Sequence, residues 1–373
     1  MNILFVLENY FPHIGGVEVL FKNLAEGLAS RGHDVSIVTH KLKETKKYEF
    51  INGVKIYRVR CFHSRYLFTF FSIPKVLKLA KDADIVHATT FNAAFPAWLA
   101  ARLRKKPCAL SVMEVWIGKW KDIGGMSSIS SKIHDILEKM IYILPFERYI
   151  CISKSTQKQL LSAGINKKKT DLVYPSVDYD LFNPNKYDRG KIREKFNLKK
   201  NFVCMFFGRP GISKGLEYLI KAVPLISQKI PNSKLLAIVS RDKVYRRRYD
   251  YILKLIKDLK IEDKVILINS VPREDLPSYI KASDCMIVPS LAEGFGFTVA
   301  ESCAMDVPVV ASNVGSIPEV ISGKYVLVEP RNPKTIAEGI ERIHSGKIKK
   351  TKKKFFKKED SIKKYIEIYK KLK

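Results

Sequence analysis

Short apolar runs alternate with longer stretches of helical periodicity along nearly the whole chain. Asn2 to Leu7 and Asp34 to Thr39 are such runs, and Val17 to Arg31 between them predicts an amphipathic helix closed by Gly32. This alternation is typical of parallel α/β units rather than of a sandwich or a helix bundle. The other predicted strands lie at 54–59, 84–88, 108–112, 148–152, 171–174, 202–207, 234–239, 264–268, 285–289, 308–311 and 325–328.

The 373 residues exceed the length at which single cores usually stop growing, roughly 250–300 residues, so we expect two domains. Two doubly wound sheets of about six strands each fit this length. The junction is predicted between Pro175 and Asn201, where prolines and polar residues interrupt the pattern. Ligands of such sheets bind at the carboxyl ends of the strands, so the cleft between two such edges is the expected active site.

The formal net charge of +30 implies an anionic partner, such as a nucleotide, a nucleic acid or an acidic membrane surface. A lysine-rich segment, Lys347 to Lys358, carries part of this excess, although charge runs are commonly solvated faces. Six scattered cysteines without a CxxC motif indicate a reducing cytoplasm and argue against a zinc site. No signal peptide and no apolar run of about 18 to 20 residues is found, so any membrane contact is expected to be peripheral.

The segment from Pro289 to Glu301 runs from a predicted strand through a loop with two glycines into a helix that begins near Thr298. N–H groups at the start of a helix attract phosphate or other anions. Glu293 and Glu301 flank this site. Carboxylates would repel a phosphate placed on them, and they are better suited to accept hydrogen bonds from hydroxyl groups. The alternative is one solvated acid in the loop and another on the helix.

Two other loops follow predicted strands. Arg209 and Lys214 lie after the first strand of the second half, where a guanidinium and an ammonium suit a diphosphate, although the loop lacks the Walker A order. Two exposed basic residues in a basic protein are the alternative. Gly15 and Gly16 join the first strand to the first helix without forming GxGxxG, which leaves phosphate contact and a tight turn equally open.

His87 ends a predicted strand, where its imidazole would bind a sugar hydroxyl or an acceptor, or serve a structural role instead. Asp82 with Asp84, and Asp178 with Asp180, match the DxD pattern of metal-dependent sugar transfer, but one pair caps a strand and the other lies in the linker. We therefore expect no metal.

Two segments combine aromatic and basic side chains. One runs from Arg58 to Lys81, and the other contains Trp116, Lys119, Trp120 and Lys121. Such pairs suit a membrane interface, although core packing of the aromatic rings and stacking on RNA are alternatives.

Taken together, these motifs resemble the retaining glycosyltransferases of family 4, whose GT-B fold has two Rossmann-like domains facing across a cleft. Glu293 with Glu301, Gly208-Arg209 with Lys214-Gly215, the Gly15-Gly16-Val-Glu loop and Gly315 to Ile321 follow the family's order. The resemblance implies an acceptor-side domain at 1–175 joined by a C-terminal helix at 360–373, an interdomain segment at 176–200, and a nucleotide-sugar domain at 201–358.

The resemblance also implies the residue roles. Arg209 and Lys214 would bind the donor diphosphate, Glu301 the ribose and Glu293 the donor sugar, while His87 would face the reacting centre. The remaining donor contacts would come from Gly15, Gly16, Phe295, Gly296, Phe297 and Thr298. The donor would be a UDP- or GDP-sugar, and the acceptor a lipid-linked or cell-envelope glycan, reached from the cytoplasm at an acidic membrane surface.

Retention would proceed by front-side attack without a metal or a carboxylate nucleophile. The chain departs from the family in two places. It has Thr89 where many members have a histidine, and Met113-Glu114 where they often have a His-Asp pair. Both departures lie on the acceptor side. The opening looks like the N-acetylglucosamine transferases of the GPI pathway. A nucleotide-sugar epimerase and a basic RNA-binding protein are the alternative functions.

Overall fold

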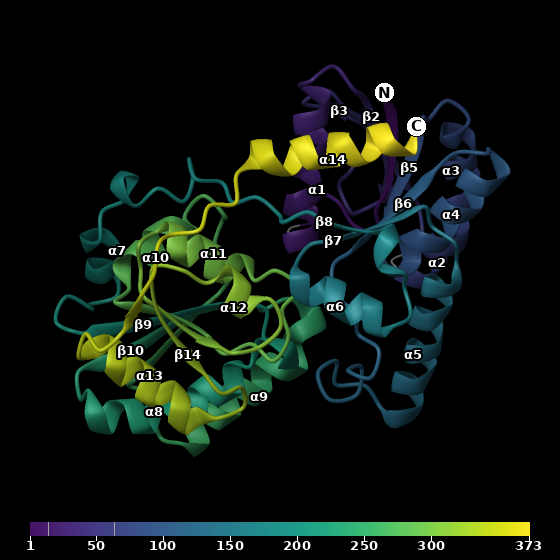
Figure 1. The fold of residues 1–373 in the computed structure, drawn as a ribbon. Coiled ribbons are helices and arrows are strands. Elements are labelled where there is room, and N and C mark those ends of the chain that lie inside the picture. The colour runs from purple at the N-terminus through teal and green to yellow at the C-terminus, as the bar shows by residue number, and fades with distance from the viewer. Residues whose placement is uncertain (14, 63) are drawn as a thin grey trace. The chain divides into compact units, whose positions relative to one another are not determined.

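The computed structural model describes residues 1–13, 15–62 and 64–373, and it contains two compact units. The first unit comprises residues 1–120, 127–176 and 356–373, and the second comprises 121–126 and 177–355. Figure 1 traces the chain from the purple N-terminus to the yellow helix at the C-terminus, which belongs to the first unit. The segment expected to link the domains, residues 176–200, lies almost entirely within the second unit.

The described residues of the first unit form an eight-stranded sheet with the order β3-β4-β2-β1-β5-β6-β7-β8. Its strands are parallel except that β3 runs antiparallel to β4. The strand β1, in the middle of this sheet, is buried from Ile3 onward, because helices cover both faces of the sheet. The strands are β1 (Asn2–Val6), β2 (Asp34–His40), β3 (Tyr48–Ile51), β4 (Val54–Val59), β5 (Ile85–Thr89), β6 (Cys108–Val112), β7 (Arg148–Cys151) and β8 (Thr170–Leu172).

Apart from the C-terminal helix α14, the helices of the first unit lie between successive strands in the sequence, as the periodicity predicts. Small residues dominate the buried face of α4, which allows close packing on the sheet. The helices are α1 (Gly16–Ala29), α2 (Arg65–Phe71), α3 (Ile73–Ala80), α4 (Ala94–Leu103), α5 (Ser128–Ile143), α6 (Lys154–Ser162) and α14 (Lys358–Leu372), with 3-10 turns at Phe91–Ala93 and Lys167–Lys169.

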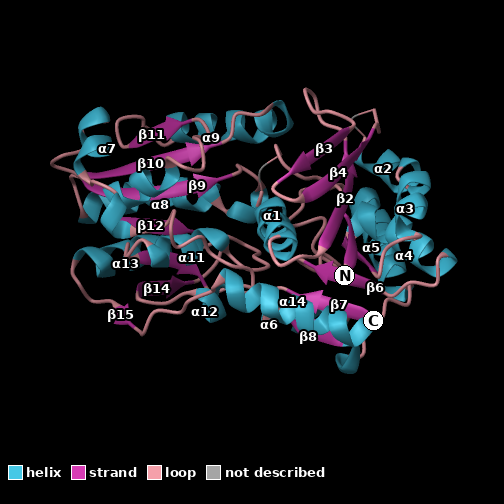
Figure 2. Ribbon diagram, turned by 90° about the horizontal axis from the view of Figure 1, so that it is seen from above, coloured by secondary structure: helices cyan, strands magenta, loops and turns pink. Residues whose placement is uncertain are grey.

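The second unit repeats this plan around a seven-stranded sheet with the order β11-β10-β9-β12-β13-β14-β15, counted over the described residues. Figure 2 shows its strands in magenta, side by side from β11 to β15, and in Figure 1 helices lie on both sides of them. Only β15 runs antiparallel to its neighbour. The strands are β9 (Phe202–Gly208), β10 (Ser233–Val239), β11 (Val265–Ile268), β12 (Cys285–Val288), β13 (Val309–Ser312), β14 (Lys324–Val328) and β15 (Lys349–Lys350).

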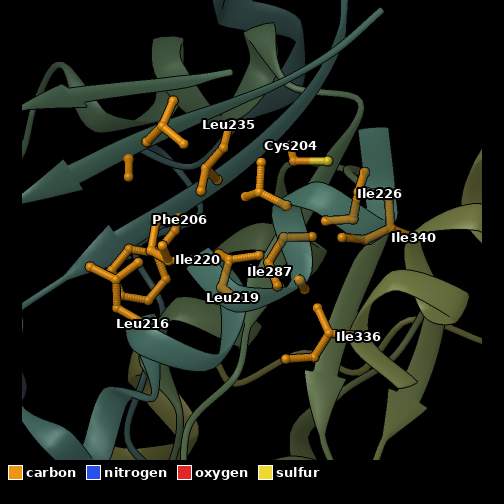
Figure 3. Packing of buried hydrophobic residues seen from close by; sticks show 14 of the residues in the cluster. Cys204, Phe206, Leu216, Leu219, Ile220, Ile226, Leu235, Ile287, Ile336 and Ile340 are labelled. Carbon is orange, nitrogen blue, oxygen red and sulfur yellow. The ribbon is translucent and has the colours of Figure 1, made fainter. Parts of the chain in front are cut away.

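The core of the second unit lies between its sheet and the pair α8 and α13 (Figure 3). Leu219 and Ile220 of α8 pack with Ile287 of β12 and with Ile336 and Ile340 of α13, all fully buried. The helices are α7 (Gly190–Lys195), α8 (Leu216–Lys229), α9 (Arg246–Asp258), α10 (Leu276–Ala282), α11 (Phe297–Ala304), α12 (Ile317–Val320) and α13 (Pro333–His344), with 3-10 turns at Pro184–Lys186, Ile212–Lys214 and Lys243–Tyr245.

The two doubly wound α/β domains predicted from the sequence are confirmed. The sheets have more strands than the six expected for each, partly because the antiparallel edge strands β3 and β15 went unpredicted. The C-terminal helix expected at 360–373 is present as α14, and Ile362, Tyr365 and Tyr369 on one side of it are buried. No helix in the described ranges is both long and apolar enough to cross a bilayer.

Candidate active site

Three loops of the second unit are joined at the carboxyl edge of its sheet. They follow β9, β12 and β13. The amide of Leu291 donates to the carbonyl of Ser213 at 2.7 Å, which ties the β12 loop to the β9 loop. The amide and hydroxyl of Ser316 both donate to the carbonyl of Glu293, at 3.2 and 3.1 Å. These two bonds tie the β12 loop to the β13 loop. The loops that carry Lys214 and Glu293 therefore form one connected structure.

Two glycines are required for this contact. Gly215 has a φ of +65°, and a Cβ atom there would lie 2.0 Å from the carbonyl oxygen of Pro289. Gly315 has a φ of +52°, and its Cβ would lie 2.4 Å from the carbonyl oxygen of Glu293. Both conformations favour glycine, and both close approaches involve backbone atoms that cannot rotate away.

Glu293 lies at the centre of the joined loops. Its Oε1 accepts a hydrogen bond from Lys214 Nζ at 2.7 Å and another from Ser290 Oγ at 2.8 Å. Only 9% of the glutamate side chain is exposed, against 28% for the lysine. The structure thus brings together Lys214 and Glu293, which the sequence placed in separate loops. A charge-assisted bond of this kind fixes the carboxylate while the ammonium keeps two further donors.

Glu301 lies inside α11 and is almost wholly buried. Its Oε1 accepts a hydrogen bond from Arg273 Nη2 at 2.5 Å. Burial raises the pKa of the Glu301 carboxyl above its usual value, and the charge of Arg273 works in the opposite direction. The arginine therefore helps to keep a buried carboxylate ionised.

Arg273 was not predicted from the sequence. It lies between β11 and α10, at the same end of the sheet as the other loops, and its guanidinium also lies 5.2 Å from the ring centroid of Phe182. The available signal was its position, because a basic residue that follows a strand of a parallel sheet faces the edge where ligands bind.

Arg209 lies in the same group of loops but is exposed. Its Nη1 is 3.4 Å from the hydroxyl of Tyr245, in the 3-10 turn that precedes α9. This contact is long for a hydrogen bond.

The N-terminus of α11 is formed by glycine. Gly296 has a φ of +83° and provides no side-chain cap, so the first N–H groups of the helix are not satisfied by a capping side chain. Phe295 is buried against Phe297, with ring centroids 5.1 Å apart, and Thr298 follows in the first turn. This geometry fits the predicted anion site at Phe297 and Thr298.

Gly15 and Gly16 lie at the start of α1 in the first unit. Gly15 is in extended conformation, and a Cβ there would lie 2.5 Å from Glu18 Oε2. The same carboxylate contacts His13 Nδ1 at 3.0 Å. A negative charge therefore already lies beside this helix N-terminus, where it interacts favourably with the helix dipole.

His87 is fully buried within β5. Its Nδ1 lies 2.6 Å from the hydroxyl of Tyr369 in α14, and its Nε2 lies 2.8 Å from the hydroxyl of Ser111 in β6. Burial lowers the pKa of the imidazole to about 3. This placement differs from the expected one at the reacting centre, because a ring with no exposed surface and two bonded nitrogens is not available to a substrate. His87 instead connects α14 to the sheet.

The two DxD pairs have local structural roles. Asp84 accepts from the amide of Asn2 at 2.9 Å, and Asp178 accepts from the amides of Asp180 and Leu181. Among the described residues, no three histidine, cysteine or acidic side chains are grouped so that they could hold a metal ion.

Two family models match the chain in succession. The model described as Glycosyltransferase Family 4 covers residues 14–181, and that described as Glycosyl transferases group 1 covers residues 188–362. An uncharacterized glycosyltransferase of Methanocaldococcus jannaschii is 32% identical over 365 residues, which is 92% of this chain and 89% of that protein. The chain belongs to the family 4 glycosyltransferases.

One human subunit of phosphatidylinositol N-acetylglucosaminyltransferase is 24% identical to this glycosyltransferase over 352 residues, 91% of this chain and 68% of that protein. The similarity expected at the opening therefore extends over most of the chain. The Anabaena protein HepE, solved in complex with UDP and glucose, has a TM-score of 0.74 at 18% identity over the full length of both chains. This likeness confirms the GT-B fold.

Proposed function

We propose that this glycosyltransferase moves a sugar from a nucleoside diphosphate sugar to a lipid-linked or cell-envelope glycan with retention of anomeric configuration and without a metal. The observation that carries the proposal is the pair of lysine–glutamate and arginine–glutamate contacts at one sheet edge. Lys214 holds Glu293, and Arg273 holds Glu301, beside the uncapped start of α11. Cations and carboxylates placed together suit a ligand that has both phosphates and hydroxyls.

Different residues of this site would bind different parts of the donor, according to their charge. Lys214, Arg209 and the amides of Phe297 and Thr298 would hold the diphosphate, because fixed cations and helix N-termini favour negative charge. Glu301 would accept hydrogen bonds from the ribose and Glu293 from the transferred sugar. HepE was solved with UDP, which supports a nucleotide ligand for this fold.

The reaction would break the bond between the anomeric carbon and the leaving phosphate oxygen while the acceptor oxygen forms its bond on the same face. The acceptor proton passes to the leaving phosphate, so a nucleoside diphosphate is released and no enzyme nucleophile is needed. Lys214 and the α11 amides would stabilise the charge that develops on the leaving group, since they are already positioned before the bond breaks.

A lipid-linked acceptor is supported by the name of the human relative, which includes phosphatidylinositol. We place the reaction at the cytoplasmic face of a membrane. All six cysteines are free and buried, as is usual in a reducing compartment. Peripheral contact with acidic lipid would bring the acceptor to the enzyme.

The test is transfer of radiolabel from UDP- and GDP-sugars into an organic-extractable lipid fraction in the presence of membranes. We expect label in the lipid with one donor, and NMR of the product should show the anomeric configuration of the donor. Interconversion of free sugar nucleotides without transfer would instead indicate an epimerase. An inverted product would contradict the front-side mechanism.

A further inference from the structure

Helix α5 exposes an apolar face to solvent. Six large apolar side chains of this helix are 47% to 78% exposed, although side chains of this kind are normally turned toward a core. They are Ile129, Ile133, Ile136, Leu137, Met140 and Ile143. Because they recur at intervals of three and four residues, they form one stripe along the helix, about 21 Å long at 1.5 Å per residue.

The opposite face of α5 is buried and carries polar groups as well as apolar ones, since Ser131 and Glu138 lie on it together with Tyr142. Glu138 is almost completely buried, and its oxygens accept from the amide of Trp116, the indole of Trp120 and the hydroxyl of Tyr142. These bonds fix the rotation of the helix. The apolar stripe is therefore held outward by a satisfied polar network rather than left exposed by loose packing.

Helix α2 extends this surface. The hydroxyl of Tyr66 lies 3.1 Å from His134 Nε2, which joins the two helices; both lie on the same side of the first unit in Figure 1. Tyr66, Phe70 and Phe71 are 44% to 61% exposed, and Phe62, itself exposed, packs its ring against Phe71. We call the α5 stripe and these four aromatic residues the α5–α2 face.

The charges around the α5–α2 face are positive. Lys132 and Lys139 are exposed and border one side of the stripe, and Arg60 lies over the Phe62 ring at 5.5 Å. The acids of α5 point elsewhere, because Glu138 is buried and Asp135 accepts from the amide of Gly118 at 2.7 Å. In a symmetric contact between two copies of this face, the lysines of one copy would meet those of the other and repel them.

We propose that the α5–α2 face docks on an acidic lipid surface, with the isoleucines and Met140 of α5 entering the boundary between headgroups and acyl chains. Lys132 and Lys139 then reach anionic headgroups from the edge of the stripe, and Tyr66 and Phe70 lie at the headgroup level. This docking deepens the proposed function, because it gives a lipid-linked acceptor a surface. It needs no sugar donor, so the two proposals can fail separately.

The test is sedimentation of the full chain with vesicles of phosphatidylcholine alone or with about one third phosphatidylserine, followed by Ile133→Glu and Met140→Glu. We expect binding to the acidic vesicles, weakened at least ~10-fold in each variant, because a carboxylate is placed where an apolar side chain enters the bilayer. Lys132→Gln with Lys139→Gln should remove most of the preference for acidic vesicles and its salt dependence.

Leu253→Glu is the matched control. It lies on α9 in the second unit, is 44% exposed and makes the same change in charge, so we expect unaltered vesicle binding. Circular dichroism and donor-induced thermal shifts should match wild type in all variants. Equal binding by wild type and the Ile133 and Met140 variants would overturn the proposal. So would a stable dimer or a captured protein partner that protects this face while vesicles do not bind.

Discussion

His87 within β5 of the first unit and Glu301 inside α11 of the second are both buried polar residues, and the sequence suggested a site role for each. Their partners differ. His87 is enclosed by the neutral hydroxyls of Ser111 and Tyr369, whereas Glu301 is bonded to Arg273, whose side chain is 23% exposed. The first arrangement stabilises packing of α14 on the sheet. The second keeps a charge at an edge that solvent, and hence a ligand, can reach.

The largest effect is expected from Gly215→Ala. This change would separate the joined loops of the second unit, to which the Glu301 site belongs. The new Cβ would collide with the Pro289 carbonyl, so we expect loss of ~1–3 kcal/mol of stability and of most transfer activity. Gly323→Ala is the control, since Gly323 also has positive φ, +75°, but has open space at the Cβ position. Equal losses in both variants, measured by denaturation and initial rates, would mean that φ alone matters.

Lys214→Ala and Glu301→Gln should each lower kcat/KM for the donor by at least ~10-fold, because each removes a charged hydrogen-bonding partner. Lys229→Ala provides a matched control. Lys229 also pairs with a glutamate, Glu341, but this pair lies on the exposed surface of α8 and α13. Removing the Lys229 ammonium should therefore leave the kinetics unchanged. Wild-type kinetics in both site variants would sink the assignment of the donor site.

Arg273→Gln tests how Glu301 keeps its charge. Without the guanidinium, burial acts unopposed and the pKa of Glu301 rises further. If the ribose is bound by the ionised carboxylate, the acid limb of the pH profile of kcat/KM should move to higher pH. KM should then change less at neutral pH than at acid pH. Arg246→Gln, in an exposed pair with Asp250, should leave the profile in place. An unmoved acid limb in the Arg273 variant would assign the arginine to stability alone.

The smallest effect on activity is expected at His87. Its pKa is about 3 in the fold against about 6.5 in the unfolded chain, so protons bind preferentially to the unfolded chain between these values. The contribution of neutral, buried His87 to the free energy of unfolding is complete above about pH 6.5. It is lost as the pH falls, at up to ~1.4 kcal/mol per pH unit. His87→Gln should lack this slope in urea unfolding at pH 7 and pH 5 while kcat stays near wild type. A large fall in kcat with unchanged stability would restore a catalytic role.

The arrangement of strands and helices could be predicted because burial on both faces makes parallel strands continuous apolar runs. β4 has the predicted bounds, and β9 differs by one residue. β3 and β15 could not be predicted in this way, since one is exposed and the other consists of two lysines. β3 pairs with the next strand, β4, across the turn at Asn52 and Gly53, whereas β15 pairs with β14, from which α13 separates it in the sequence.

The donor edge was predictable in part. The sequence placed Lys214 and Glu293 in two separate loops; their contact could not be predicted without the strand order, in which β9 lies beside β12. Arg273 carries no motif, and its importance comes from a contact across 28 positions. For the aromatic cluster at Trp116 and Trp120 the sequence left membrane contact, core packing and stacking on RNA open, and it could not show that both indoles donate to buried or partly buried glutamates. Helical spacing cannot tell which face of α5 points outward, because that is decided by Glu138.

The central claim, that the joined loops of the second unit bind a nucleoside diphosphate, is tested most directly by thermal shift with UDP, GDP and ADP and their sugars. We predict that one nucleotide raises the Tm of the wild-type chain by several degrees at ~100 times its Kd, as expected for a ligand that binds only the folded state. The shift should be largely lost in Lys214→Ala and Glu301→Gln and kept in Lys229→Ala. A shift of equal size in all four proteins would contradict the claim, as would the absence of any shift.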